Sequence, residues 1–451
     1  MLETSTLSAR EIALRVLRQL EAGQATCDRL LQDLLSRLSL PAVERGLAVE
    51  LIYGVERWRG KIDWILAQVS RYPLVDLTPW IRNILRLGAY QLLFLERVPA
   101  SAAVNEAVKL AHRHGHPGTA KLVNGVLREV ERRRENWKVL EPGGDPAHTL
   151  AVTHSHPEWL VRRWIRRWGL EKAAAICATN NRIPPTTVRI NTLRVDRDEV
   201  EKLLSREKVE FFRCSLFREA LHLNLHGAVT ALTAFQKGLF TVQDEGAILV
   251  APLLDPAPGD RILEICAAPG GKTTHLGERM ENQGEILAVD RSRRRLSLLE
   301  DNCRRLGLTL VRPLASDILS RALSEGLWEK VLVDVPCSNL GMLRRNPDAR
   351  WLHREEDLER LPVTQLQILR SAGDYVAPRG VLVYATCSNE KEENEGVVSQ
   401  FLQENPGFHV ESVMPFLPAE AAGAVGRSGY LEVVPGCGEA GGIFAARLRR
   451  S

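Results

Sequence analysis

The sequence predicts a multidomain protein: an all-helical N-terminal domain, a small α+β linking domain and a C-terminal α/β domain with a doubly wound parallel sheet. The chain has 451 residues, more than one hydrophobic core usually serves. Apolar residues recur at helical spacing from residue 8 to about 135. After residue 240, short apolar runs alternate with helical segments, as in a parallel sheet covered on both faces. We therefore expect domains at 1–140, 141–240 and 241–451.

The N-terminal domain begins with a clearly delimited helix. In "SAREIALRVLRQLE" the apolar residues Ile12, Val16 and Leu20 fall on one helical face. Ser8 and Glu11 have the spacing of a capping box, which predicts the start of this helix. The helical pattern continues to "GTAKLVNGVLREVERR", interrupted by "HRHGH" (112–116), whose histidines are expected in a solvated loop. The domain should therefore consist of helices alone.

The linking domain follows a stretch rich in proline and glycine. "NWKVLEPGGDPAHTL" (136–150) predicts a linker. After it, "PEWLVRRWIRRWGLEKAAAICATN" predicts a basic helix, "TTVRINTL" a strand and "RDEVEKLLSRE" another helix. We expect a small mixed domain here.

The C-terminal domain should contain five buried strands joined by helices. The expected helices are at about 272–282, 291–306 and 358–376. The expected strands are "RILEI" (261–265), "EILAVD" (285–290), "LTLVRPLASD" (308–317), "KVLVDVP" (330–336) and "GVLVYATCS" (380–388).

Charge is divided unevenly along the chain. Residues 1–240 carry 36 Lys and Arg against 26 Asp and Glu, whereas residues 241–451 carry 24 against 30. We therefore expect the N-terminal half to contact a polyanion. Trp164 and Trp168 fit either stacking on bases or packing in a core. Long apolar segments and a signal sequence are lacking, so we expect a cytoplasmic protein without membrane association.

The eight cysteines form no C-x-x-C pair, so we expect free thiols and no metal site.

The segment "EICAAPGGKTTHL" (264–276) resembles a phosphate-binding loop, but Cys266 stands where that loop needs its first glycine. Its residues instead predict a strand, a turn of small residues and a helix capped by Thr273 or Thr274. The small residues let a ligand approach the helix N-terminus, which attracts a carboxylate as readily as a phosphate.

Two acidic residues follow the next expected strands. Asp290 ends "EILAVD", where an acidic residue of a doubly wound fold accepts hydrogen bonds from ribose hydroxyls. Asp317 ends the strand after it and could meet an adenine amino group. Together they predict a nucleoside-type cofactor at this edge of the sheet.

Two cysteines occupy the same edge. Cys337 in "DVPCSN" and Cys387 in "YATCSN" each come just after a buried strand. A thiolate that adds to C6 of a pyrimidine makes C5 nucleophilic enough to attack an electrophilic methyl group. Nearby positive charge, for which Lys272, Arg344 and Arg345 are candidates, would favour the thiolate. Spacing alone leaves both cysteines open as the nucleophile.

These motifs carry a family resemblance. "CAAPGGKTTHL", "DVPCSNLGMLRRNPD" and "YATCSNEKEENEGVV" resemble the motifs of the RNA cytosine-C5 methyltransferases of the RsmB (Fmu/Sun) family. "GAYQLLFLERVPASAAVNEAVKLA" and "KLVNGVLR" resemble the RNA-binding domain of the antitermination factor NusB. "THSHPEWLVRRW", "RINTLR" and "GLFTVQDEGA" look like the linking region of the same enzymes. The resemblance covers nearly the whole chain and implies a NusB-like domain followed by a Rossmann-like class I methyltransferase domain.

The resemblance also implies roles for individual residues. Cys387 would be the nucleophile, Cys337 would act in product release, and Asp334 would lie near the cofactor methyl group and the target base. Asp290 would bind the ribose and Asp317 would lie near the adenine. The loop that would line S-adenosylmethionine comprises Cys266, Ala267, Ala268, Pro269, Gly270, Gly271 and Lys272.

The function so implied is methylation of a cytosine in 16S rRNA by a monomer, acting on naked RNA or an early assembly state. Two alternatives are the same chemistry on tRNA and a non-catalytic RNA-binding or antitermination factor.

Three places depart from the family's pattern. Val335 stands where Ala is usual, Arg379 replaces a turn glycine, and Gly441 and Ile443 stand where Asp and Phe are common.

Overall fold

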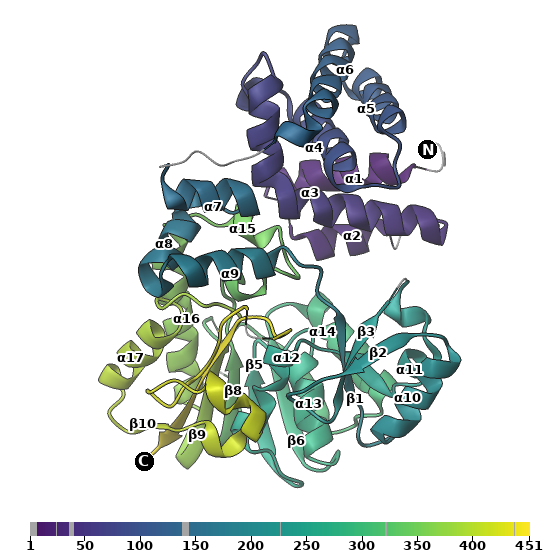
Figure 1. The fold of residues 1–451 in the computed structure, drawn as a ribbon. Coiled ribbons are helices and arrows are strands. Elements are labelled where there is room, and N and C mark those ends of the chain that lie inside the picture. The colour runs from purple at the N-terminus through teal and green to yellow at the C-terminus, as the bar shows by residue number, and fades with distance from the viewer. Residues whose placement is uncertain are drawn as a thin grey trace. The chain divides into compact units, whose positions relative to one another are not determined.

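The computed structural model describes residues 7–23, 25–35, 40–137, 144–225, 227–320, 323–436 and 438–451. The chain forms two compact units (Figure 1). The first comprises Met1–Arg182 together with Leu343–His353, and the second comprises Ile183–Met342 and Arg354–Ser451. The linking region is thus divided near residue 182, and the three-domain division at 140 and 240 stays a prediction.

The described residues of the first unit form helices and turns without a strand, and the helical pattern predicted for residues 8 to about 135 is confirmed. Its core is formed by apolar faces of the first six helices. The helices are α1 (Ala9–Glu21), α2 (Cys27–Leu35), α3 (Ala42–Val69), α4 (Pro79–Phe94), α5 (Ala100–His114), α6 (Pro117–Arg132), α7 (Pro146–His154), α8 (Glu158–Trp168), α9 (Leu170–Asn180) and α15 (Ala349–Leu352), with 3-10 turns η1 (Leu74–Asp76) and η2 (Arg134–Asn136).

Several local predictions in this unit need correction. Ser8 caps α1, but the buried Glu11 carboxylate pairs with Arg15 rather than completing a capping box. Helix α7 begins inside the predicted linker, because Asp145 caps it. The predicted basic helix is two helices, because Gly169 has a φ of 80° and ends α8.

The histidines of residues 112–116 do not form a loop. His112 and His114 lie in the last turn of α5, and His116 caps α6. Nε2 of His114 donates a hydrogen bond to the Glu11 carboxylate, and the ring stacks on Trp80. These contacts give the histidines a structural role. Trp164, at 3% exposure, packs in the core.

The segment Leu343–His353 belongs to the helical unit, although in the sequence it stands between two stretches of the second unit. Figure 1 shows its helix α15, in green, beside α7 and α9. Arg350 is fully buried and donates hydrogen bonds to the carbonyls of Ser155 (2.7 Å) and Asn180 (3.3 Å). Asp348 accepts from the amide of Cys27 at 2.9 Å. The segment therefore satisfies backbone groups of the surrounding helices.

The second unit begins with a small antiparallel sheet in the order β2-β3-β1-β4. The predicted strand and helix, now β1 and α10, are confirmed. The elements are β1 (Thr186–Ile190), α10 (Arg197–Arg206), β2 (Glu210–Arg213), β3 (Ala220–Asn224), η3 (Val229–Ala231), α11 (Thr233–Gln236) and β4 (Phe240–Val242).

The large sheet has the order β10-β12-β9-β8-β5-β6-β7, with β11 (Leu431–Val433) paired to β12. The five predicted strands are present and parallel, whereas β12 is antiparallel to β9. The strands are β5 (Arg261–Ile265), β6 (Glu285–Asp290), β7 (Val311–Ala315), β8 (Trp328–Asp334), β9 (Val376–Thr386), β10 (Phe408–Glu411) and β12 (Ile443–Arg450).

Helices cover both faces of this sheet, which explains why its strands are apolar throughout. Ile262 and its neighbours on one face pack with α13 and α14, whereas Leu263 and its neighbours on the other pack with α16 and α17. The helices and turns are α12 (Glu245–Ile248), η4 (Ala251–Leu254), α13 (Gly271–Arg279), α14 (Arg293–Leu306), η5 (Leu340–Met342), α16 (Asp357–Gly373), α17 (Glu395–Glu404), η6 (Met414–Phe416) and η7 (Ala419–Ala424).

In the described part of the chain, no helix combines the length and the apolar composition needed to cross a membrane.

Candidate active site

The predicted site residues meet at the carboxyl edge of the large sheet. The strand order reverses at β5, because β6 lies on one side of it and β8 on the other. Ligands of open α/β sheets bind at such a switch point. Asp334 ends β8, Cys266 follows β5, and Cys387 follows β9. The fold therefore brings together three groups that are distant in the sequence.

The loop after β5 brings its backbone close to α14. Gly270 has a φ of 99°, and a Cβ there would lie 2.7 Å from the side chain of Leu299. Helix α13 begins at Gly271 without a side-chain cap, so the expected cap by Thr273 or Thr274 is wrong. The first turn of α13 can therefore receive an anionic group at its amides.

As predicted, Asp290 lies at the end of β6, and its side chain is buried at 4% exposure. Its carboxylate accepts hydrogen bonds from the amides of Ala268 (3.2 Å) and Ser292 (2.8 Å). Asp290 thus also holds the loop after β5 in place. Asp317 follows β7, is exposed, and accepts from the amide of Leu319 at 3.0 Å.

A partly buried ion pair bridges the switch point. Lys272 lies in the first turn of α13, is 7% exposed, and its Nζ lies 2.7 Å from Oδ2 of Asp334. Burial opposes the charge on the lysine, but Asp334 and the Cys387 thiolate together raise the pKa of Lys272. Lys272 therefore provides a permanent positive charge beside Cys387.

The two motif cysteines are neighbours, and both are only partly buried. The amide of Cys387 donates to the sulfur of Cys337 at 3.3 Å. A hydrogen bond from Cys337 lowers the pKa of Cys387, and Lys272 lowers it further against the opposing effect of burial. The same bond and burial raise the pKa of Cys337. The pair therefore favours a thiolate at Cys387 and a protonated thiol at Cys337.

Glu393 joins the two cysteine loops and is fully buried. Its carboxylate accepts hydrogen bonds from the amide of Ser338 (2.8 Å), from the hydroxyls of Ser338 and Ser388, and from Gln365 (2.9 Å). Because Ser338 follows Cys337 and Ser388 follows Cys387, this carboxylate fixes one thiol relative to the other.

Sequence reasoning missed Glu393 and also Arg189. Arg189 lies on β1, is fully buried, and forms an ion pair with Glu278 of α13 at 2.9 Å. It also donates to the carbonyl of Gly271 at 3.1 Å, so it anchors the first turn of α13. A charged residue between the apolar residues Val188 and Ile190 of a short strand was the available signal.

The two arginines expected near the thiols have different surroundings. Arg344 and Arg345 belong to the segment that lies in the helical unit, and Arg344 donates to the carbonyl of Arg182 at 3.3 Å. Lys272 is therefore the predicted cation that acts on Cys387 within the second unit.

Family models match three parts of the chain. The model described as 16S rRNA methyltransferase RsmB/F matches residues 251–449. The NusB family model matches residues 7–132, and a ferredoxin-like domain of RsmF/B-like methyltransferases matches residues 156–230. The predicted combination of a NusB-like helical domain, a linking α+β domain and a methyltransferase domain is thereby confirmed.

Similar proteins span nearly the full chain. The probable ribosomal RNA small subunit methyltransferase B of Bacillus subtilis is 36% identical over 98% of this chain and 99% of its own. Ribosomal RNA small subunit methyltransferase B of Klebsiella pneumoniae is 32% identical over 98% of both chains. The crystal structure of PH0851 has a TM-score of 0.83 and 26% identity, covering 99% of this chain and 100% of its own. The chain therefore belongs to the RsmB/F family of 16S rRNA methyltransferases.

Proposed function

We propose that the protein transfers a methyl group from S-adenosylmethionine to C5 of a cytosine in 16S rRNA through a covalent bond to Cys387. The observation that carries this proposal is the thiol pair at the carboxyl edge, in which the Cys387 amide donates to the Cys337 sulfur at 3.3 Å and Cys337 and Lys272 lower the pKa of Cys387. The names of the relatives support a ribosomal RNA substrate.

The residues at the switch point fit the cofactor. An uncapped helix N-terminus at Gly271 suits its carboxylate, and the buried Asp290 suits its ribose hydroxyls. Ala267 and Ala268 are small enough for close approach to the loop. We propose that residues 266–272, Asp290, Asp317 and Asp334 bind the cofactor, which supplies an electrophilic methyl group when bound.

The thiolate of Cys387 starts the reaction by forming a bond to C6 of the cytosine. The electron pair of the C5–C6 double bond then becomes available at C5, which takes the methyl group. After a base removes the C5 proton, the double bond re-forms and the sulfur–C6 bond breaks. Cys387 leaves as a thiolate, which the Cys337 thiol and Lys272 stabilise again.

The cytosine must leave its stack to reach Cys387, so the target base is flipped or unpaired. We propose that the basic residues 1–240, as the predicted 1–140 and 141–240 domains, hold naked or early-assembly rRNA through phosphate contacts. The enzyme would act as a cytoplasmic monomer.

The test uses labelled S-adenosylmethionine and 16S rRNA from cells lacking the enzyme, with modified cytosines mapped by bisulfite. We expect one protected cytosine in 16S rRNA and none in tRNA. Label in tRNA alone would favour the tRNA alternative. RNA binding without any transfer would favour the non-catalytic factor.

Two variants test the cysteine roles. We expect Cys387→Ala to abolish transfer and covalent adduct, and Cys337→Ala to accumulate a protein–RNA adduct that survives denaturing electrophoresis. Adduct formation by Cys387→Ala but not by Cys337→Ala would reverse the assignment.

A further inference from the structure

Three potential metal ligands converge in the second unit, away from the thiol pair. Cys214 lies in the loop between β2 and β3, His222 on β3, and Glu245 at the start of α12. All three are buried, with 7%, 8% and 3% of their surfaces exposed. Their ligand atoms lie within 4.8 Å of one another. Nothing in the proposed methyl transfer uses them.

Glu245 is the centre of the cluster. Its Oε1 accepts a hydrogen bond from the Cys214 thiol at 2.8 Å and lies 2.7 Å from Nε2 of His222. In a cysteine hydrolase the histidine stands between the thiol and the carboxylate, because it must take the thiol proton. Here the carboxylate stands between the other two. The order therefore disfavours a nucleophilic triad.

The histidine is already oriented as metal-binding histidines are. Its Nδ1 lies 3.2 Å from the hydroxyl of Thr187, which is its register partner on β1. Metal-bound histidines usually have such a partner on the second nitrogen, which fixes the ring and its tautomer. Nε2 is thereby directed toward Glu245 and Cys214.

The Cys214 thiol now donates its proton to Oε1 of Glu245 at 2.8 Å, so an ion would take the place of that proton. A divalent cation would balance the thiolate and the carboxylate and release the thiol proton.

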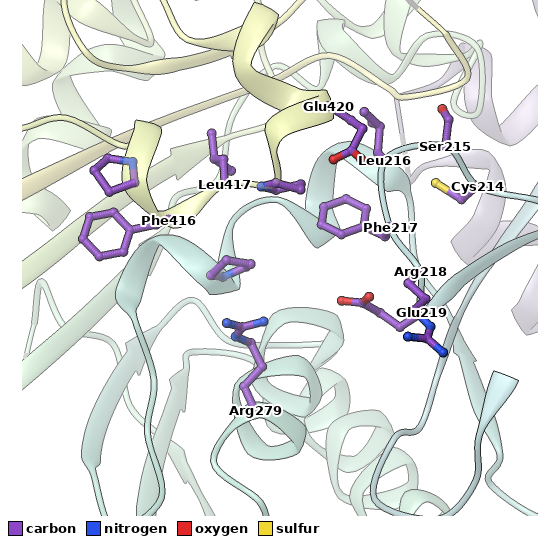
Figure 2. A pocket seen from close by; sticks show the side chains of 13 residues that line it. Cys214, Ser215, Leu216, Phe217, Arg218, Glu219, Arg279, Phe416, Leu417 and Glu420 are labelled. Carbon is purple, nitrogen blue, oxygen red and sulfur yellow. The ribbon is translucent and has the colours of Figure 1, made fainter.

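We propose that Cys214, His222 and Glu245 bind one zinc ion, with water as the fourth ligand. Sulfur, imidazole and carboxylate ligands are the set that zinc prefers. Cys214 also lines a cavity of about 580 Å³ (Figure 2). In Figure 2 its sulfur is seen beside Ser215 and Leu216, and Phe416 and Leu417 form the far side. Of the three proposed ligands, Cys214 is the one that lines this cavity.

Admitting the ion requires the three ligand atoms to rearrange. Tetrahedral zinc with ordinary bond lengths sets sulfur–oxygen and nitrogen–oxygen separations of about 3.5 and 3.3 Å. The present separations are 2.8 and 2.7 Å. The Glu245 carboxylate would withdraw by about 1 Å, and the Cys214 sulfur and the His222 nitrogen, now within 4.8 Å, would come to about 3.6 Å through side-chain rotation.

The ion would fasten the small sheet to the methyltransferase domain. Cys214 and His222 come from the β2–β3 hairpin, whereas Glu245 begins α12. The preceding residue, Asp244, acts electrostatically on Cys387 and accepts a hydrogen bond from the amide of Gly441 at 2.9 Å. Zinc at Glu245 would thus hold the segment that reaches the active site.

The test is metal binding by the full-length protein without an affinity tag and without RNA or cofactor. After chelator treatment, we expect it to bind one Zn²⁺ per chain by mass spectrometry of the metal. Co²⁺ alone should give a thiolate-to-metal charge-transfer band, and zinc should raise the unfolding temperature. A protein that binds neither Zn²⁺ nor Co²⁺ would overturn the proposal.

Matched variants locate the site. We expect Cys214→Ser to abolish the cobalt band and Glu245→Gln, which can keep the hydrogen bonds, to weaken zinc binding more than about 100-fold. Cys303→Ser, another buried cysteine, and Cys387→Ser should leave one zinc bound. Zinc retained by Cys214→Ser, or lost in Cys387→Ser, would overturn the assignment. Failure of methyl transfer has no bearing on this readout.

Discussion

Removal of the Glu393 carboxylate should destabilise the second unit by about 3 kcal/mol. In Glu393→Ala, the hydroxyls of Ser338 and Ser388, 3.2 Å apart, can bond to each other. Gln365 keeps its bond to the carbonyl of Pro336 at 3.1 Å. The amide of Ser338 and one N–H of Gln365 lose their acceptor, and each unsatisfied buried donor costs about 1–3 kcal/mol.

The glutamine variant separates charge from hydrogen bonding. In Glu393→Gln, the carbonyl oxygen can face the Ser338 amide and Gln365, and the amide nitrogen can donate to the two hydroxyls. All four bonds can then persist without the charge, so we expect a loss of only about 1 kcal/mol.

Urea unfolding and methyl-transfer rates provide the assay. We expect Glu393→Ala to lower kcat by about 100-fold or more, because the two thiols would no longer be held at fixed positions relative to each other. Glu395→Ala, whose carboxylate is partly exposed and 3.8 Å from Lys391, serves as control and should change stability by less than about 0.5 kcal/mol. Equal stability of the alanine variant and the control would refute the reasoning.

Three further outcomes are expected. Lys272→Met should raise the pKa of Cys387, so that its alkylation by iodoacetamide reaches half-maximum at higher pH. Burial raises the pKa of Glu264 from 4.5 to about 8, so stability falls as pH rises from about 5 to 8. Glu264→Gln should remove that fall in urea titrations at several pH values. Arg350→Met should cost the helical unit about 3 kcal/mol, measured by thermal unfolding, because it leaves buried carbonyls without donors.

Much of the fold and of the candidate site could be predicted from local sequence patterns. Apolar runs predicted β5 to β9, and their shared direction predicted that Asp290 and the two cysteines would meet at one edge. Those features depend on a few neighbouring residues and on the geometry of parallel sheets. Local patterns failed at helix ends, where Gly270 rather than a threonine precedes α13.

The features that sequence reasoning missed all depend on distant contacts. Arg189 contacts Glu278, and Cys214 contacts Glu245. The residues of each pair are far apart in the sequence, so neither helical nor strand periodicity relates them. Glu393 lies near Cys387 in sequence, but its importance depends on Ser338, which follows a different strand. Each buried charge acquires its role only when the fold brings its partner to it.

The insertion of Leu343–His353 into the helical unit has a consequence for how the protein is made. During synthesis, the N-terminal helices leave the ribosome long before Arg350 is available to bind the carbonyls of Ser155 and Asn180. The first unit therefore reaches its final form only after most of the second has been translated. A gene fragment ending at Arg182 would lack Arg350, so the carbonyls of Ser155 and Asn180 would lose the hydrogen bonds that it donates.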